Sequence, residues 1–141
     1  MSTLLFISKD LLKDFLTNST TITNWSITLI GASFLSIIST SYYKPEKGKL
    51  IYLLLFPAWG FLALSAHKSV ELNDIYTSID FINPLAPDFS EQLKIPGKMI
   101  NDHYASQVEY FYWGVGILII WLIAVVLFWI FEKPKSKESI I

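Results

Sequence analysis

Three charge-free runs of mainly apolar residues divide the chain, over residues 25–43, 50–66 and 110–131. A helix needs about 20 such residues to cross the hydrocarbon core of a bilayer, because each residue adds 1.5 Å of length. Each run is close to that length. The pattern therefore predicts an all-α integral membrane protein with three transmembrane helices, built as a single membrane domain over residues 1–141.

The segment before the first run has an amphipathic pattern. Apolar side chains recur at helical spacing through Leu4, Ile7, Leu11 and Phe15, and charged residues lie between them. This spacing predicts an interfacial amphipathic helix over residues 3–16. The polar stretch over residues 17–24 is expected to turn the chain from this helix into the first span.

The 67–109 segment between the second and third runs is expected to be an outer loop with helical extensions. Helical spacing of apolar residues predicts that the second span continues outward to Ile79. Pro84 and Pro87 then break the chain, and Asp88 is expected to cap a short helix. A turn at Pro96-Gly97 should follow, and the third helix should begin near residue 98 and run to residue 131. Residues 132–141 are expected to form a cytoplasmic tail.

Lysines and aromatic residues indicate the orientation of the spans. Lysines are densest at Lys44, Lys47, Lys49, Lys133, Lys135 and Lys137. Because cytoplasmic loops carry an excess of basic residues, the N-terminus is expected outside and the C-terminus in the cytoplasm of a plasma or inner membrane. The expected aromatic belts comprise Trp25, Tyr110, Tyr112 and Trp113 at one interface and Tyr42, Tyr43, Tyr52 and Trp129 at the other. Trp121 should lie near the midplane, packed against protein.

Composition narrows the functional classes further. Charged residues make up 16% of the chain, against about 25% in an average soluble domain, and the net charge is −1. Such a chain has no basic field for nucleic acid. Without cysteine, disulfides and thiolate metal sites are excluded. No cofactor is expected.

Hydroxyl side chains on the first span form the first candidate site, made of Ser26, Ser33, Ser36 and Thr40. Small hydroxyl residues let helices pack closely, and they also line water-filled pores, so both roles stay open. In the second span, Pro57 and Gly60 form a candidate hinge, because proline removes a backbone donor and can kink a helix.

The outer loop carries the remaining candidates. Carboxylates that would form an acidic mouth in an oligomer are Glu71, Asp74, Asp80, Asp102 and Glu109. His67, Glu71 and His103 are weak candidates for metal ligands, and their spacing matches no closed site. Either histidine would also suit a pH sensor.

No phosphate loop, zinc motif or nucleophile elbow occurs in the sequence, so we expect a protein that is not an enzyme. The first hypothesis is a homo-oligomeric membrane channel or pore-forming protein with an acidic outer mouth. The alternative is an accessory subunit of a larger membrane complex. A sensor whose outer loop binds a ligand or ion is a weaker third possibility. The expected partners are the lipid bilayer and either further copies of the chain or other membrane subunits.

Overall fold

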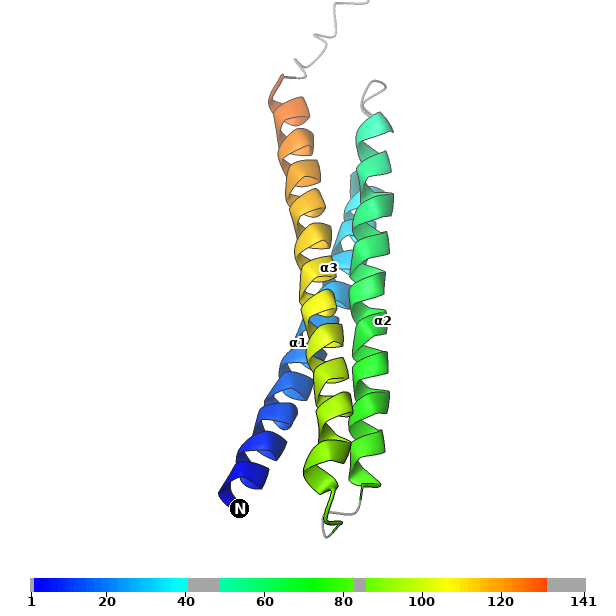
Figure 1. Cartoon of the computed structure of the whole chain (residues 1–141). Coiled ribbons are helices and arrows are strands. Elements are labelled where there is room, and N and C mark those ends of the chain that lie inside the picture. The colour runs from blue at the N-terminus through cyan, green and yellow to red at the C-terminus, as the bar shows by residue number, and fades with distance from the viewer. Residues whose placement is uncertain (1, 41–48, 83–85, 132–141) are drawn as a thin grey trace, which may run out of the picture.

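The structure is a computed structural model that describes residues 2–40, 49–82 and 86–131. Its elements are α1 (Ser2–Thr40), the 3₁₀-helix η1 (Lys49–Leu54), α2 (Leu55–Asp80) and α3 (Phe89–Phe131) (Figure 1). These ranges contain no strand. The prediction of an all-α fold is therefore confirmed for the described chain.

Three helical segments are long and apolar enough to cross a membrane: Leu11–Ser39, Leu50–Ile79 and Lys94–Phe128. They mark the chain as a multi-pass membrane protein. The helices are longer than a crossing requires, since the 43 residues of α3 span about 65 Å and a hydrocarbon core is about 30 Å thick. One part of the bundle is thus expected to project from the membrane.

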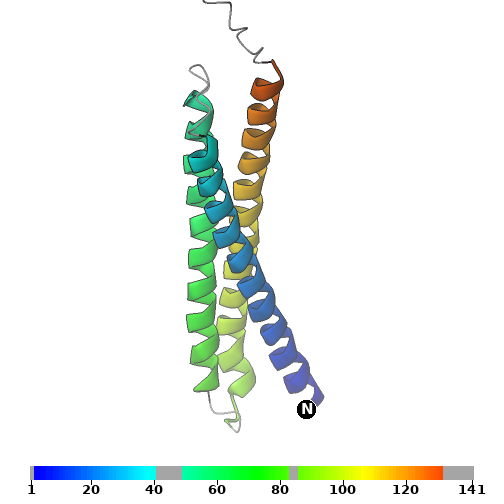
Figure 2. The same ribbon diagram turned by 180° about the vertical axis from the view of Figure 1, so that it is seen from behind.

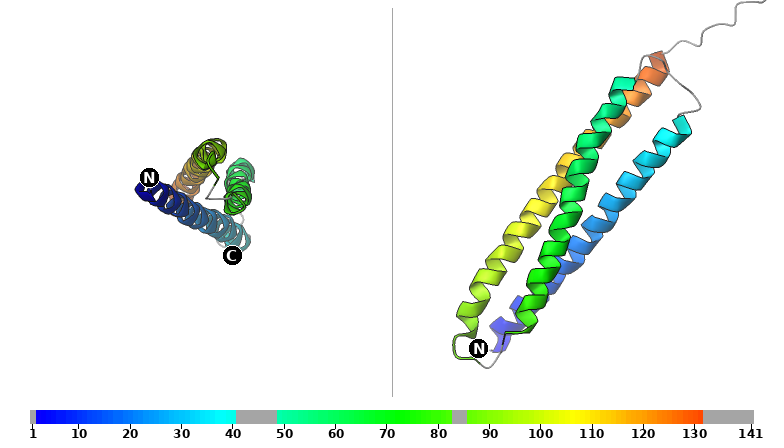
Figure 3. Two further views of the ribbon diagram at one scale, coloured as in Figure 1. Left: turned by 60° about the horizontal axis from the view of Figure 1, so that its bottom comes forward. Right: turned by 90° about the vertical axis from the view of Figure 1, so that its right-hand side faces the viewer.

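The three helices form one elongated bundle. The N-terminal end of α1 and the α2–α3 connection lie at one end, and the C-terminal ends of α1 and α3 lie at the other (Figure 1). Thus α1 and α3 run in the same direction and α2 runs against both. Helices α2 and α3 lie nearly side by side, whereas α1 crosses them at an angle, as the views from behind and from the side show (Figures 2 and 3).

A seven-residue repeat sets the face that each parallel helix turns inward. On α1 the interior positions are Leu12, Ser19, Ser26 and Ser33, and on α3 they are Ile100, Gln107, Gly114 and Trp121. A repeat of seven keeps one seam of a helix facing its neighbours in left-handed bundle packing. The burial of Trp121, with 7% of its surface exposed, confirms that it packs against protein.

The bundle interior changes character along its length. At the end that holds the α2–α3 connection, Leu12, Leu72, Ile79 and Ile100 form an aliphatic core. Further along, the buried side chains of α1 are serines. An aliphatic core stabilises a bundle in water, whereas between helices in lipid close packing of small residues and hydrogen bonds contribute more. The change is what a bundle passing from water into a membrane requires.

Gly114 of α3 packs directly against α2. A Cβ atom added there would lie 2.7 Å from Leu62 Cγ and 3.2 Å from the carbonyl oxygen of Ala58. Leu62 and Ala58 are both fully buried. The absence of a side chain at residue 114 therefore lets the two helices meet.

The expected turn over residues 17–24 is wrong, because α1 continues through it without a break. The hydroxyls of this stretch are satisfied within the helix. Thr17, Thr20 and Thr21 each donate to the carbonyl oxygen four residues earlier, at 2.9–3.0 Å. These bonds show how α1 accommodates the threonines, although such bonding itself slightly destabilises a helix.

The turn expected at Pro96-Gly97 is also wrong, since both residues lie within α3. The helical structure is interrupted between α2 and α3, as expected, and Pro87 lies in that interruption. Asp88 precedes the first residue of α3, and its carbonyl oxygen accepts the N–H groups of Glu91 and Gln92 at 2.9 and 3.0 Å. The helix that follows is one element of 43 residues rather than two.

Pro57 is the third residue of α2, immediately after η1. Proline cannot donate to the carbonyl four residues earlier, which here belongs to Leu53 within the 3₁₀ segment. The hydrogen bond that Pro57 cannot make thus falls at the junction of η1 and α2 rather than within α2. Several predicted features lie outside the described residues: the turn proline Pro84, the tyrosines Tyr42 and Tyr43, the lysines Lys44, Lys47, Lys133, Lys135 and Lys137, and the 132–141 tail.

Candidate functional site

Buried polar side chains from all three helices meet in one layer around Gln107. Its amide nitrogen donates to the carbonyl oxygen of Ser19 at 3.0 Å and to Thr23 Oγ1 at 3.2 Å. From α2, Ser65 Oγ donates to the carbonyl oxygen of Gln107 at 3.0 Å. Ser19 Oγ also donates to Ser69 Oγ at 3.0 Å. We call these five residues the polar layer.

Burial makes the hydrogen bonds of the polar layer important. Ser19, Ser65 and Gln107 have no exposed surface. A buried polar group without a partner costs about 1–3 kcal/mol, so the layer favours the helix register that pairs its members. Gln107 Oε1 is buried without a hydrogen-bond partner in the described structure.

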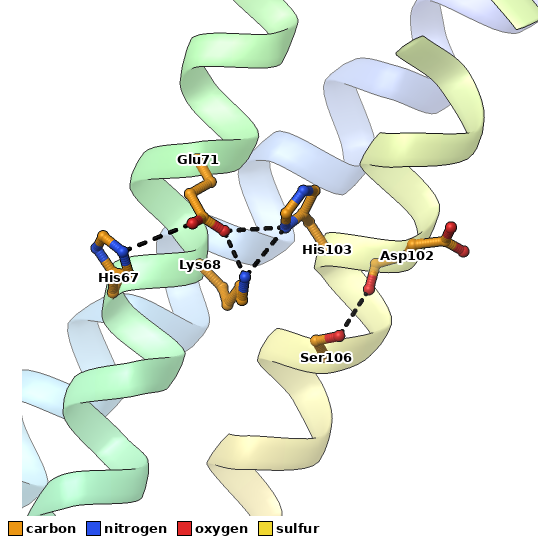
Figure 4. Close-up of polar contacts among 6 residues, drawn as sticks. All are labelled: His67, Lys68, Glu71, Asp102, His103 and Ser106. Carbon is orange, nitrogen blue, oxygen red and sulfur yellow. Dashed lines mark hydrogen bonds and ion pairs between the residues drawn. The ribbon is translucent and has the colours of Figure 1, made fainter. Parts of the chain in front are cut away.

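A charged cluster lies one helical turn beyond the polar layer, in the seam between α2 and α3 (Figure 4). Glu71 is at its centre: Oε2 accepts from Lys68 Nζ at 2.6 Å and lies 3.0 Å from His103 Nδ1. Oε1 lies 3.6 Å from His67 Nε2. Lys68 Nζ also approaches His103 Nδ1 at 3.4 Å. Within the described residues, the contact between Glu71 and His103 is the ion pair that joins two helices.

Of the three weak metal candidates, the structure places His67 and His103 beside the carboxylate of the third, Glu71. The Lys68 ammonium, however, occupies the space beside Glu71 and His103 that a cation would need. A search of the described residues finds no group of three or more histidine, cysteine or acidic side chains able to hold a metal ion. The cluster is best described as a partly buried ion-pair network.

Two of the four hydroxyl candidates on α1 point into the interior of the single chain. Ser26 is fully buried, and Ser33 is 7% exposed. Ser33 Oγ donates to the carbonyl oxygen of Ile30 and accepts the indole N–H of Trp59 at 2.7 Å. Ser36 is half-buried and donates to the carbonyl oxygen of Ala32. The side chain of Thr40, the last residue of α1, lies outside the described set.

The acidic candidates do not converge within one chain. Asp74, Asp102 and Glu109 are exposed, and the Asp102 carboxylate points away from Glu71 (Figure 4). The side chain of Asp80 is not among those described. The hinge candidate Gly60 is exposed, with no atom within 4 Å of an added Cβ.

Sequence reasoning missed Gln107, the residue with the most interhelical hydrogen bonds in the polar layer. It lies within the 67–109 segment that was expected to be an outer loop, and polar residues are common in loops. The signal that would have found it is the seven-residue step from Ile100 through Gln107 to Gly114 and Trp121. On the parallel helix, Leu12, Ser19, Ser26 and Ser33 take the same step.

The geometry described so far provides helix packing, hydrogen bonds and ion pairs, with no nucleophile held beside a base in the described residues. Comparison of the chain with protein-family models, curated proteins and solved structures finds no match. The functional proposals below therefore rest on the sequence and on the geometry of this bundle.

Proposed function

We propose that the protein is a non-catalytic integral membrane protein that functions as a homo-oligomer, with α1 forming the contact between copies. Following the lysine distribution, the end of the bundle with the α2–α3 connection faces the outside of the membrane. The proposal rests on one observation, namely the chemistry of the α1 face that points away from the bundle.

One strip of that outward face of α1 is mostly small and polar. Its exposed residues include Thr21, Asn24, Thr28, Ala32 and Ser39, together with one large apolar residue, Leu35. Larger exposed side chains flank the strip: Trp25, Ile27, Phe34 and Ile38. The residues of the strip lie opposite Ser19, Ser26 and Ser33, which α1 turns into the interior. Thr28 and Ser39 each donate to a carbonyl oxygen within α1. Their hydroxyl donors are satisfied, and their short side chains leave the helix backbone accessible to a neighbour.

The outward face of α3 differs from this strip of α1 in side-chain size and polarity. Its exposed side chains between residues 119 and 127 are large and apolar: Ile119, Ile120, Leu122, Ile123, Val126 and Leu127. Such a surface suits lipid chains. Small and hydroxyl residues instead favour close contact with another helix, because backbones can approach and hydrogen-bond. The contrast supports α1 as the assembly helix.

The first experiment compares two identical substitutions at exposed alanines. Ala32→Leu adds bulk to the α1 face, and Ala63→Leu adds the same bulk to exposed α2. The oligomeric state of each full-length variant is measured by native mass spectrometry from a mild detergent. We expect Ala32→Leu to weaken association about tenfold or more, which corresponds to about 1.4 kcal/mol, and Ala63→Leu to leave it unchanged. A wild-type protein that is monomeric would contradict the proposal.

A channel between copies is the second candidate, favoured by the same hydroxyl face together with the exposed Asp74, Asp102 and Glu109. Because Ser26 and Ser33 are buried within one chain, the pore would instead be lined by Thr21 and Thr28 of each copy. Thr28→Val removes a hydroxyl without changing size, so it should lower the conductance of planar bilayers while the oligomer persists. An absence of conductance in the wild-type oligomer would leave α1 as a packing surface only.

The alternative proposal is an accessory subunit, in which the α1 face binds a different membrane protein. Affinity purification from the native membrane separates the two proposals. Recovery of a stoichiometric second subunit, released by Ala32→Leu, would favour the accessory role. Recovery of further copies of the chain alone would favour the homo-oligomer.

A further inference from the structure

An open groove of about 780 Å³ follows α3 where that helix passes beside α1. It is lined by Asn101, Ala105, Glu109, Tyr112 and Gly116 of α3 and by Phe15 of α1, among others. Phe15 packs edge-on against Tyr104, with ring centroids 4.9 Å apart, which joins the two helices beside the groove. Its volume falls within the range of about 300–1,000 Å³ that is usual for small-molecule sites.

The groove follows α3 for about 22 Å, from Asn101 to Gly116, at 1.5 Å per residue. The headgroup region of one leaflet is about 5–7 Å thick, because a bilayer of about 40–45 Å contains a hydrocarbon core of about 30 Å. Along the helix, Glu109 precedes Tyr112 and Trp113 by about 4.5–6 Å, which is within that thickness. We propose that this groove binds one phospholipid with an amine-bearing headgroup, from the leaflet at the end of the bundle that holds the α2–α3 connection.

Glu109 and the inner end of the groove suit the two parts of a lipid. Glu109 lies midway along the groove, and its carboxylate suits a headgroup. Tyr112 and Trp113, both exposed, follow at the level where aromatic side chains favour the membrane interface. At the inner end, an added Cβ on Gly116 would meet no atom within 4 Å, which leaves space for an acyl chain.

Charge determines which headgroup fits. Glu109 is the one charged residue among those that line the groove in the described chain, and it is exposed. A carboxylate attracts the ammonium of phosphatidylethanolamine and repels the net negative charge of phosphatidylglycerol. The site therefore discriminates between these two lipids by charge, independently of whether copies of the chain associate.

The test uses the full-length protein with equal amounts of phosphatidylethanolamine and phosphatidylglycerol of the same acyl composition. Native mass spectrometry reports which lipid stays bound. We expect preferential retention of one phosphatidylethanolamine, by a factor of up to about five, the largest effect typical of an exposed ion pair. Glu109→Gln should remove the preference and Glu109→Lys should reverse it. Glu91→Gln, an exposed carboxylate of α3 outside the groove, should change neither.

Occupancy of the groove itself is tested by fluorescence. A phosphatidylethanolamine with brominated acyl chains should quench Trp113, and Trp113→Phe should remove that share of the quenching. Gly116→Phe should fill the inner end and displace the lipid. Equal retention of both lipids by the wild type, or an unchanged preference in Glu109→Lys, would overturn the proposal. A bound lipid that survives Gly116→Phe would also overturn it.

Discussion

The contact at Gly114 allows a sharp test, because α3 contains a second glycine two residues away in a different environment. In Gly114→Ala the new Cβ would lie 2.7 Å from Leu62 Cγ and 2.8 Å from Leu62 Cδ2. Leu62 is fully buried, and the carbonyl oxygen of Ala58, at 3.2 Å, belongs to the backbone, so rotation of the Leu62 side chain cannot relieve the crowding fully. At Gly116 the same substitution would meet no atom within 4 Å.

The magnitude follows from comparing the two variants. Overpacking a well-packed interior costs about 1–3 kcal/mol. Replacing glycine by alanine within a helix contributes up to about 1 kcal/mol of stability through helix propensity. That contribution is shared by both variants and cancels in their difference. We therefore expect Gly114→Ala to be about 1–3 kcal/mol less stable than Gly116→Ala.

Stability is measured by reversible unfolding of the purified protein in mixed micelles, followed by circular dichroism. Gly116→Ala is expected to be as stable as the wild type or slightly more stable. If the two variants differ by less than about 0.5 kcal/mol, Gly114 is not a tight contact and the packing of α2 on α3 described above is incorrect.

Four further variants test the interior and the charged cluster. Trp59→Phe removes the hydrogen bond to Ser33 and should cost about 0.6–1.7 kcal/mol in the same unfolding assay. Gln107→Leu should be nearly neutral, because it removes the unpartnered Oε1 along with the two bonds of the amide nitrogen, whereas Gln107→Ala should cost about 2–4 kcal/mol by leaving a cavity. Glu71→Gln should cost at most about 1 kcal/mol, because it replaces a partly exposed carboxylate that accepts from Lys68 at 2.6 Å and lies 3.0 Å from His103.

Controls separate these effects from general damage. Trp25→Phe changes an exposed tryptophan of α1 and should leave stability within about 0.5 kcal/mol of the wild type. For the polar layer, equal losses in Gln107→Leu and Gln107→Ala would show that its hydrogen bonds outweigh packing. For the charged cluster, a Glu71→Gln variant more stable than the wild type would show that these ion pairs do not stabilise the bundle.

The three membrane-length helices could be predicted from the sequence because lipid forces a long charge-free run into a helix. The helix ends, and the merging of the expected short helices into α1 and α3, could not. Threonine and proline favour turns in short peptides, yet Thr17 and Thr21 bond within α1, and α3 continues through Pro96. A proline removes only one hydrogen bond, and the residues on either side keep the phase of the helix. Local preference was therefore outweighed by the continuity of the bundle.

The candidate site was predicted only in part. The structure places His67 and His103 beside Glu71, but the sequence does not reveal Lys68 as the cation next to them. The hydroxyl side chains of α1 can be recognised in the sequence, but their partners on α3 depend on the register between the two helices. That register is set by residues 88 positions apart, such as Ser19 and Gln107, and no local pattern reveals it.

The change of core along the bundle implies that its two ends respond differently to temperature. Burial of aliphatic surface from water carries a large heat-capacity change and weakens on cooling. The Leu12, Leu72, Ile79 and Ile100 core should therefore loosen in the cold. The interior around Ser19, Ser26 and Ser33 depends more on close packing and hydrogen bonds, which lack that dependence. If the end with the α2–α3 connection lies outside the membrane, as the proposed orientation implies, hydrogen exchange near 0 °C should open it first, so that one continuous set of helices behaves as two thermal units.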